Sequence, residues 1–97
     1  IEGASRAFLA AIQGAPESPE GYFNLGVLYD SVGKDGDAVR AIGQAVDLAP
    51  DVAHFRLALG MLLRARGRNA EALDHLRQAQ LAGAVIPPEV ERWMEAQ

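Results

Sequence analysis

The strongest constraint on the fold of this 97-residue chain is an internal repeat with a period of 34 residues. Shifting the sequence by that amount places Leu25 on Leu59 and Gly33 on Gly67. Residues 4–16 show the same correspondence with a later segment of the chain. One offset kept across three segments indicates a structural unit that is copied and stacked against its neighbours.

Each unit is predicted to form two helices joined by a tight turn, because its apolar residues recur at helical spacing. The helices are expected at residues 19–32, 53–66 and 70–82, with one more that runs through Ala38 and Ile42 to about Leu48. Ser18 suits the N-cap of the first helix and Pro19 its first helical position. Further N-caps are expected at Asp35 or its neighbour, at Asp51 and at Asn69, and the helix-ending glycines at Gly33, Gly67 and Gly83.

Small residues recur where the two helices of a unit are expected to cross. They are Gly26, Ala38 and Ala45 in the first unit, and Gly60, Ala72 and Ala79 in the second. Two helices approach closely only where the side chains at the crossing are small. The spacing therefore predicts a compact helical hairpin in each unit.

These positions resemble the tetratricopeptide repeat family. The first unit supplies every place of its pattern, with Tyr22, Leu25, Gly26, Tyr29, Ala38, Ile42, Ala45 and Pro50. The second unit supplies Leu59, Gly60, Leu63, Ala72, Leu76 and Ala79. It departs at Arg56, where a bulky apolar residue is expected and which Phe55 could partly replace, and at Ala84, where proline is expected.

The resemblance implies an all-α solenoid, a right-handed superhelix of about two and a half repeats. We expect residues 1–18 to form the second helix of a partial repeat, residues 19–52 and 53–86 two full repeats, and residues 87–97 a capping helix. Val90, Trp93, Met94 and Gln97 would share one face of that last helix, which would cover the last hairpin. An alternative use of Trp93 is to anchor a neighbouring subunit or a partner.

In this family the first helix of each repeat lines a concave groove that binds a peptide or helix of another protein. Carried over position by position, the resemblance assigns ten residues to that groove: Glu20, Phe23, Asn24, Val27, Asp30, His54, Leu57, Ala58, Met61 and Arg64. Their apolar members form a stripe with a polar border, which suits an amphipathic helix or a peptide with apolar anchors. In the alternative, this stripe packs against a neighbouring helix of the same array, either the tail or an upstream helix.

One class of the family grips the carboxylate end of chaperone peptides with lysine and asparagine at set groove positions. Here Asn24 is the single match, because Phe23 and Val27 stand where the other lysine and asparagine are needed. We therefore expect no chaperone-tail recognition.

Charge and composition exclude several other functions. The net charge of −4 argues against generic binding to nucleic acid, and no apolar run is long enough to insert into a membrane. With no cysteine, the chain has neither a thiolate metal site nor a cysteine nucleophile. His54 and His75 lie on different predicted helices, and no catalytic motif is present. No catalytic residue, metal site or cofactor is predicted.

The sequence thus predicts a protein–protein interaction module whose partner is a protein or peptide, and not an enzyme. Self-association is an alternative, because Phe8 lies on an apolar face of the partial repeat and residues 1–50 and 51–86 carry opposite net charges. A third interpretation is a docking arm of a larger protein. Arginine supplies nearly all of the positive charge, which is typical of a GC-rich bacterial source; a cytoplasmic location is slightly favoured over a periplasmic one.

Overall fold

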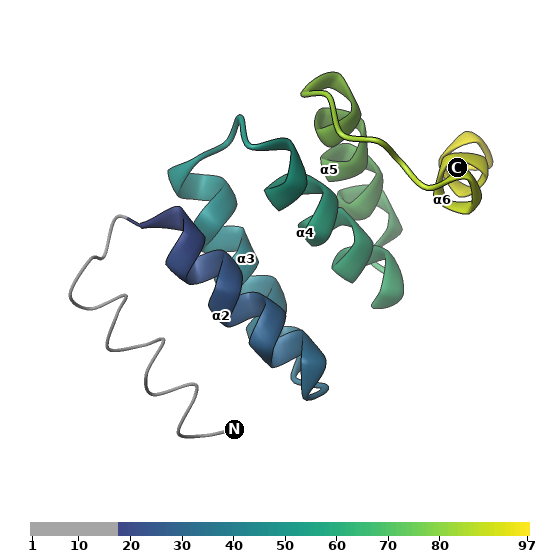
Figure 1. Cartoon of the computed structure of the whole chain (residues 1–97). Coiled ribbons are helices and arrows are strands. Elements are labelled where there is room, and N and C mark those ends of the chain that lie inside the picture. Colours follow the sequence, from purple (N-terminus) through teal and green to yellow (C-terminus); the bar gives the residue numbers. More distant parts are fainter. Residues whose placement is uncertain (1–17) are drawn as a thin grey trace. The chain divides into compact units, whose positions relative to one another are not determined.

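The computed structural model describes residues 18–97, which form α-helices and no strand (Figure 1). The helices are α2 (Pro19–Ser31), α3 (Asp35–Leu48), α4 (Ala53–Ala65), α5 (Asn69–Leu81) and α6 (Pro88–Glu95). The all-α prediction is confirmed, and α2 to α5 lie within one residue of their expected bounds. The helix expected at residues 1–18 lies, apart from its last residue, outside the described part of the chain.

The chain divides into two compact units, Ile1–Pro50 and Asp51–Gln97. The hairpin of α2 and α3 belongs to the first unit, and the hairpin of α4 and α5, together with α6, belongs to the second. The boundary lies at the Pro50-Asp51 turn, where proline ends the preceding helix.

A glycine in the first helix of each hairpin lets the second helix come close. A Cβ atom on Gly60 would lie 2.7 Å from Cγ of Leu76 and 3.2 Å from the backbone oxygen of Ala72. A Cβ atom on Gly26 would clash in the same way with the side chain of Ile42. The small-residue crossing predicted from the sequence is therefore present in both hairpins.

The helix ends agree in part with the sequence prediction. The Ser18 hydroxyl accepts a hydrogen bond from the backbone N–H of Gly21 at 3.4 Å, as expected of an N-cap. The three turns that follow α2, α4 and α5 each contain a glycine with positive φ, namely Gly33, Gly67 and Gly83.

The N-caps expected at Asp51 and Asn69 were wrong, and the one expected at Asp35 or its neighbour is the neighbour, Lys34. The N-cap residues are Lys34, Val52 and Arg68, none of which makes a side-chain capping bond. The physical reason for α3 and α5 is the short turn, since each helix starts two residues after its glycine. Asp35 thus lies inside the first turn of α3, where its charge favours the helix dipole.

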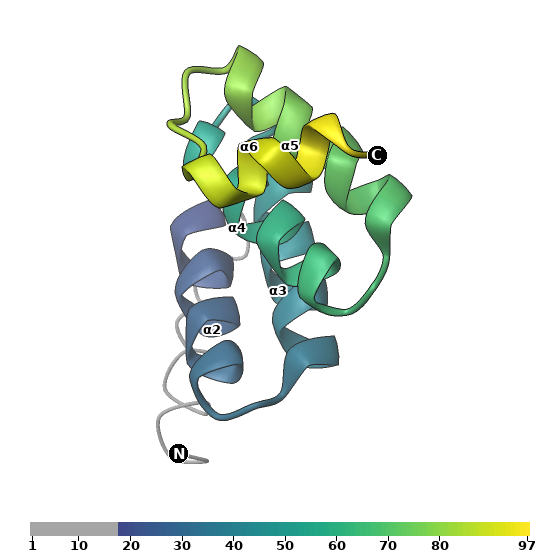
Figure 2. The ribbon, with the colours of Figure 1, turned by 90° about the vertical axis from the view of Figure 1, so that its right-hand side faces the viewer.

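Helix α6 crosses over the hairpin of α4 and α5 instead of running alongside it, as Figures 1 and 2 agree. Its Val90 is fully buried in one cluster with Leu76, Ala79 and Ile86. The partly buried apolar residues packed on this cluster come from both sides: Leu57, Met61, Ala84, Trp93 and Met94. The apolar face predicted for α6 thus packs against α4 as well as α5.

Arg56 occupies the place where the repeat pattern expects a bulky apolar side chain. It is half-buried, and its Nη1 lies 3.4 Å from Nδ1 of His75 in α5. The neighbouring Phe55 is fully buried. A polar contact between the two helices therefore replaces the expected apolar one, while Phe55 supplies apolar burial one position earlier.

Candidate functional site

The groove residues predicted on the first repeat all lie on α2, and most of them are open to solvent. Glu20, Asn24 and Asp30 are exposed, Phe23 is half-buried, and Val27 is 47% exposed. Phe23, Val27 and Asp30 follow one another at helical spacing, so they share one face of α2. This α2 face offers an exposed aliphatic side chain between polar and acidic groups.

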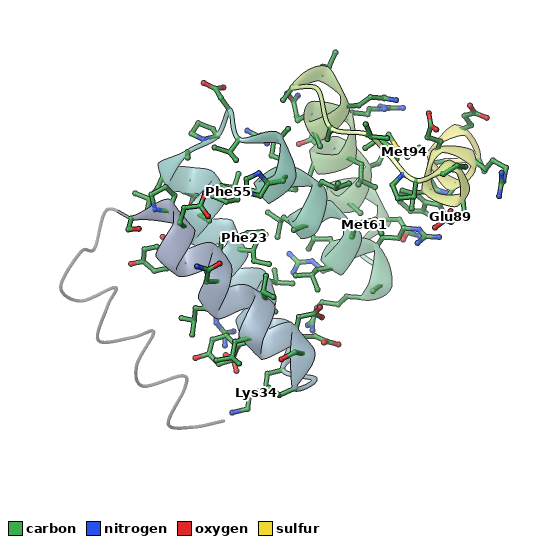
Figure 3. The ribbon with its side chains drawn as sticks, viewed as in Figure 1. Phe23, Lys34, Phe55, Met61, Glu89 and Met94 are labelled. Carbon is green, nitrogen blue, oxygen red and sulfur yellow. The ribbon has the colours of Figure 1, made fainter. Side chains whose placement is uncertain are left out.

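The groove residues predicted on the second repeat all lie on α4, but most of them are covered. His54 is exposed, whereas Leu57, Ala58, Met61 and Arg64 are half-buried. The cover over Leu57 and Met61 is the cluster to which α6 contributes Val90. Figure 3 shows Met61 on the side of α4 where α6 lies.

Leu57, Met61 and Arg64 share one face of α4, which we call the α4 face. Arg64 lies at the carboxyl end of this face and contacts α6. Its guanidinium carbon is 5.2 Å from the centroid of the Trp93 ring, within the range of a cation–π interaction. Nε of Arg64 is buried and has no hydrogen-bond partner. The cation–π contact with Trp93 therefore leaves this buried donor without an acceptor.

The α2 face and the α4 face differ in how much of each is covered by other side chains, as a pair of equivalent residues shows. Val27 and Met61 stand 34 positions apart and hold the same place in their repeats. Val27 is 47% exposed, while Met61 packs with the cluster that α6 completes. The tail-packing alternative thus describes the α4 face, whereas Val27 on the α2 face is exposed.

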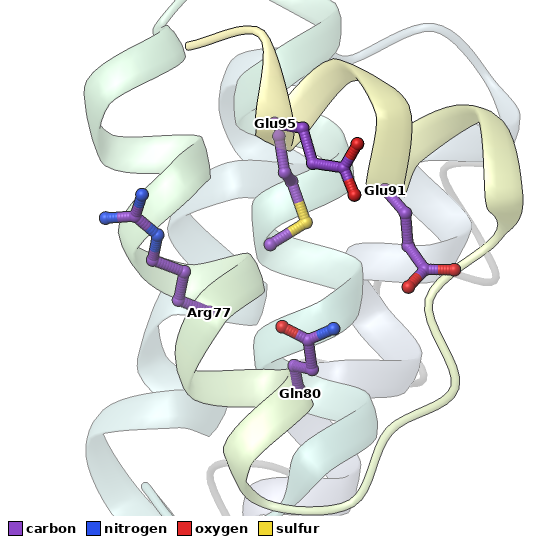
Figure 4. Close-up of a pocket in the computed structure, with 5 residues that line it drawn as sticks. Arg77, Gln80, Glu91 and Glu95 are labelled. Carbon is purple, nitrogen blue, oxygen red and sulfur yellow. The ribbon is translucent and has the colours of Figure 1, made fainter.

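A shallow cavity of about 220 Å³ lies along the seam between α5 and α6 (Figure 4). It is lined by Arg77 and Gln80 from α5 and by Glu91, Met94 and Glu95 from α6. Within residues 18–97, no ion pair joins Arg77 to either of these glutamates. This side of α6 is therefore not sealed against α5.

A second cavity, of about 270 Å³, lies on the α2–α3 hairpin. Its apolar part is formed by Tyr22, Leu25, Tyr29 and Ala41, of which Leu25 and Ala41 are buried. Asp37 and Arg40, which pair with each other, form part of its polar wall. The residues that line this cavity do not include Phe23, Val27 or Asp30 of the α2 face.

The described residues contain no group of three or more histidine, aspartate or glutamate side chains placed to hold a metal ion. None of the helices in residues 18–97 combines the length and the apolar character that crossing a membrane requires.

Sequence reasoning proposed the ten residues and kept packing of their apolar stripe against the tail open as an alternative. It did not predict the contact of Arg64 with α6. It assigned Val90, Trp93, Met94 and Gln97 to one covering face; the first three pack on the hairpin, whereas Gln97 is exposed and lies beyond the end of α6. The helical period shows which residues of α6 are apolar, but not the direction in which α6 crosses the hairpin. The bulky Trp93 and the polar Arg64 carry no signal of their pairing at the level of sequence.

Comparison with known proteins gives one family match. A model described as tetratricopeptide repeat matches residues 31–85, more than half of the chain. No curated protein sequence matches the chain significantly.

Among solved structures, the chain is similar to a crystal structure of MamA, with a TM-score of 0.79 and 23% identity over 84% of this chain and 47% of that one. It is also similar to MamA residues 41 to the end from Desulfovibrio magneticus RS-1, with a TM-score of 0.77 and 24% identity over 94% and 47% of the two chains. A third is YrrB, described as having an unusual peptide-binding site, with a TM-score of 0.74 and 26% identity over 84% and 42%. The chain thus spans less than half the length of each.

Proposed function

Because the chain belongs to the tetratricopeptide repeat family, we propose that it is a protein–protein interaction module that binds a peptide or helix of a partner on the α2 face. The single observation that carries this proposal is the exposure of Val27, an aliphatic residue with polar neighbours on a helix face. An exposed apolar anchor point inside a polar border is typical of helix- and peptide-binding surfaces.

The residues proposed to contact the partner have distinct roles. Phe23 and Val27 would bury the apolar anchors of the partner, and Asn24 would hydrogen-bond to its backbone or side chains. Glu20 and Asp30 would favour a partner with basic residues beside its anchors. The peptide-binding site described for YrrB supports a peptide as ligand, since that protein shares this fold.

The equivalent α4 residues His54, Leu57, Ala58, Met61 and Arg64 form a second proposed contact surface. In the structure α6 contacts several of them, so the first contact with a partner is assigned to the α2 face. The proposal involves binding without a catalytic step, a metal ion or a cofactor.

The test is affinity capture from a lysate of the source organism with three forms of the chain: wild type, Val27→Glu and Leu48→Glu. Leu48 is the matched control, because it is an aliphatic residue on α3 that is 42% exposed. We expect a partner that Val27→Glu loses and Leu48→Glu keeps, with unchanged helical circular dichroism. Capture of the same proteins by all three forms would contradict the proposal.

Self-association is a second candidate, favoured by two strongly exposed aliphatic residues. Leu81 and Val85 are 82% and 88% exposed and lie on either side of the turn that ends α5. If copies associate through them, sedimentation velocity of the wild type will show a mass that rises with concentration. A Leu81→Lys, Val85→Lys variant will then remain monomeric; a wild type that stays monomeric rules this candidate out.

A further inference from the structure

Helix α6 is held on the second hairpin by few side chains. It has eight residues, about two turns, which are marginal as an isolated helix in water. Its order therefore depends on packing, and that packing centres on Val90, which is fully buried. Trp93 and Met94 are half-buried beside it, and the remaining side chains of the helix are exposed.

The contact of α6 with its hairpin is incomplete in two places. Arg64 contacts the Trp93 ring of α6, and its Nε is buried without a hydrogen-bond acceptor. On the opposite side, the cavity of about 220 Å³ separates Arg77 and Gln80 from the glutamates of α6. The unpaired Nε of Arg64 and the loosely packed, charged boundary between α5 and α6 both lower the free energy needed to undock α6 from the hairpin.

The segment before α6 allows such a movement. α5 ends at Leu81, and Gly83 follows with a φ of 102°. Val85 is 88% exposed, whereas the next residue, Ile86, is buried with α6. A hinge at residues 83–85 would therefore release Ile86 and α6 together and leave the hairpin intact.

From these observations we propose that α6 is a displaceable occupant of the α4 face, whose place a helix of the partner protein takes. The inference rests on the proposed function, which supplies the partner protein. It adds that Leu57, Met61 and Arg64 bind this partner only after α6 has moved. α6 is then an intramolecular competitor that lowers the apparent affinity of the α4 face for the partner helix.

The structure of α6 gives the chemistry of the partner helix. It would carry an aliphatic residue in the place of Val90 and an aromatic residue one turn later, in the place of Trp93. An acidic side chain near the aromatic residue would give Arg64 the acceptor that α6 does not supply. A partner helix with these aliphatic, aromatic and acidic side chains would make the packing contacts of α6 and, in addition, a hydrogen bond to Arg64.

Trp93 is the single tryptophan of the chain, so its fluorescence reports directly on α6. The experiment titrates the whole chain with a synthetic peptide of residues 85–97 in which Trp93→Phe removes the tryptophan signal. We expect a saturable red shift of the Trp93 emission as the peptide displaces α6. Half-displacement should need about millimolar peptide, since a tethered segment competes at such an effective concentration.

Two variants of the whole chain sharpen the test. Val90→Ala weakens the docking of α6 and should lower the half-displacing concentration about tenfold. Arg92→Ala, at an exposed position of the same helix, is the matched control and should behave as the wild type. Circular dichroism checks that the helical content is unchanged in both.

Three outcomes would overturn the inference: no red shift at several millimolar peptide, an equal shift with a peptide that also carries Val90→Asp, or equal half-displacing concentrations for the two variants. None of them bears on the capture experiment with Val27→Glu, which tests the α2 face. Failure of one proposal is therefore distinguishable from failure of the other.

Discussion

Gly60 in α4 packs directly against Leu76 in α5: a Cβ atom added to the glycine would lie 2.7 Å from Cγ of the leucine. Leu76 is fully buried, so it has no free space into which to move. The equivalent pair in the first hairpin is Gly26 and Ile42. Helix pairing in both units thus depends on the absence of one methyl group.

The first prediction follows from this contact. Gly60→Ala should lower the free energy of unfolding by about 1–3 kcal/mol, because overpacking outweighs the gain in helix propensity. Gly43→Ala is the matched control, since Gly43 lies within α3 and a Cβ atom there meets no atom of residues 18–97 within 4 Å. That change should raise the free energy of unfolding by about 1 kcal/mol. Urea denaturation followed by circular dichroism measures both; equal effects would refute the assigned crossing.

The second prediction concerns the turn after α4. Gly67 has a φ of 78° and open space around its Cα atom, so any effect of a substitution comes from the backbone. Gly67→Ala should lower the free energy of unfolding by about 1 kcal/mol, the cost of a left-handed conformation for a residue with a side chain. Gly67→Asn should cost less, because asparagine adopts this conformation more readily. Thermal melts of the two variants compare them, and a harmless Gly67→Ala would contradict the prediction.

The third prediction concerns the polar contact between Arg56 and His75. Replacing both by leucine restores the apolar pairing that the repeat pattern expects and leaves neither group without the other. The double variant should be as stable as the wild type or more stable, since replacing both members of this half-buried polar pair by apolar groups leaves no unpaired partner.

The single change His75→Leu provides the comparison for this pair. It removes the acceptor 3.4 Å from Nη1 of Arg56 and should cost about 1 kcal/mol. Chemical denaturation gives all three free energies. A double variant less stable than His75→Leu would show that the pair does not act as a unit.

The fourth prediction separates the packing of Trp93 from its cation–π contact with Arg64. Trp93→Ala should lower the free energy of unfolding by about 1–3 kcal/mol, because α6 loses a half-buried aromatic side chain. Arg64→Met should cost less than about 1 kcal/mol, since the lost cation–π contact is offset by removal of the buried, unpaired Nε. Circular dichroism during denaturation applies to both; equal losses would show that the cation–π contact dominates.

Most of the fold could be predicted from the sequence because its determinants are local. The 34-residue period, the small residues at Gly26 and Gly60, and the turn glycines each act through neighbouring or nearly neighbouring residues. The N-caps were predicted less well, because the length of the turn after a glycine decides where a helix starts. Asp35 and Asn69 have suitable side chains for capping, but that turn places them inside their helices.

The candidate site was predicted as a set of positions on α2 and α4. The residues on the two helices differ in solvent exposure, and the repeat pattern gives no information about that difference. Val27 and Met61 hold equivalent places and are both apolar, yet their exposure depends on what packs over each helix. Sequence reasoning kept both groove binding and tail packing open for these residues. The structure shows tail packing at Met61, and binding at Val27 stays a prediction.

By itself, the sequence determined which residues form helices, which pairs of helices associate, and which residues lie at their crossings. These properties depend on helical periodicity and on side-chain size, which act over a few turns. The tertiary structure alone decided that α6 crosses the hairpin, packs over Leu57 and Met61, and brings Trp93 to Arg64. Such contacts join residues about 30 positions apart, and their geometry depends on the balance of packing across three helices at once.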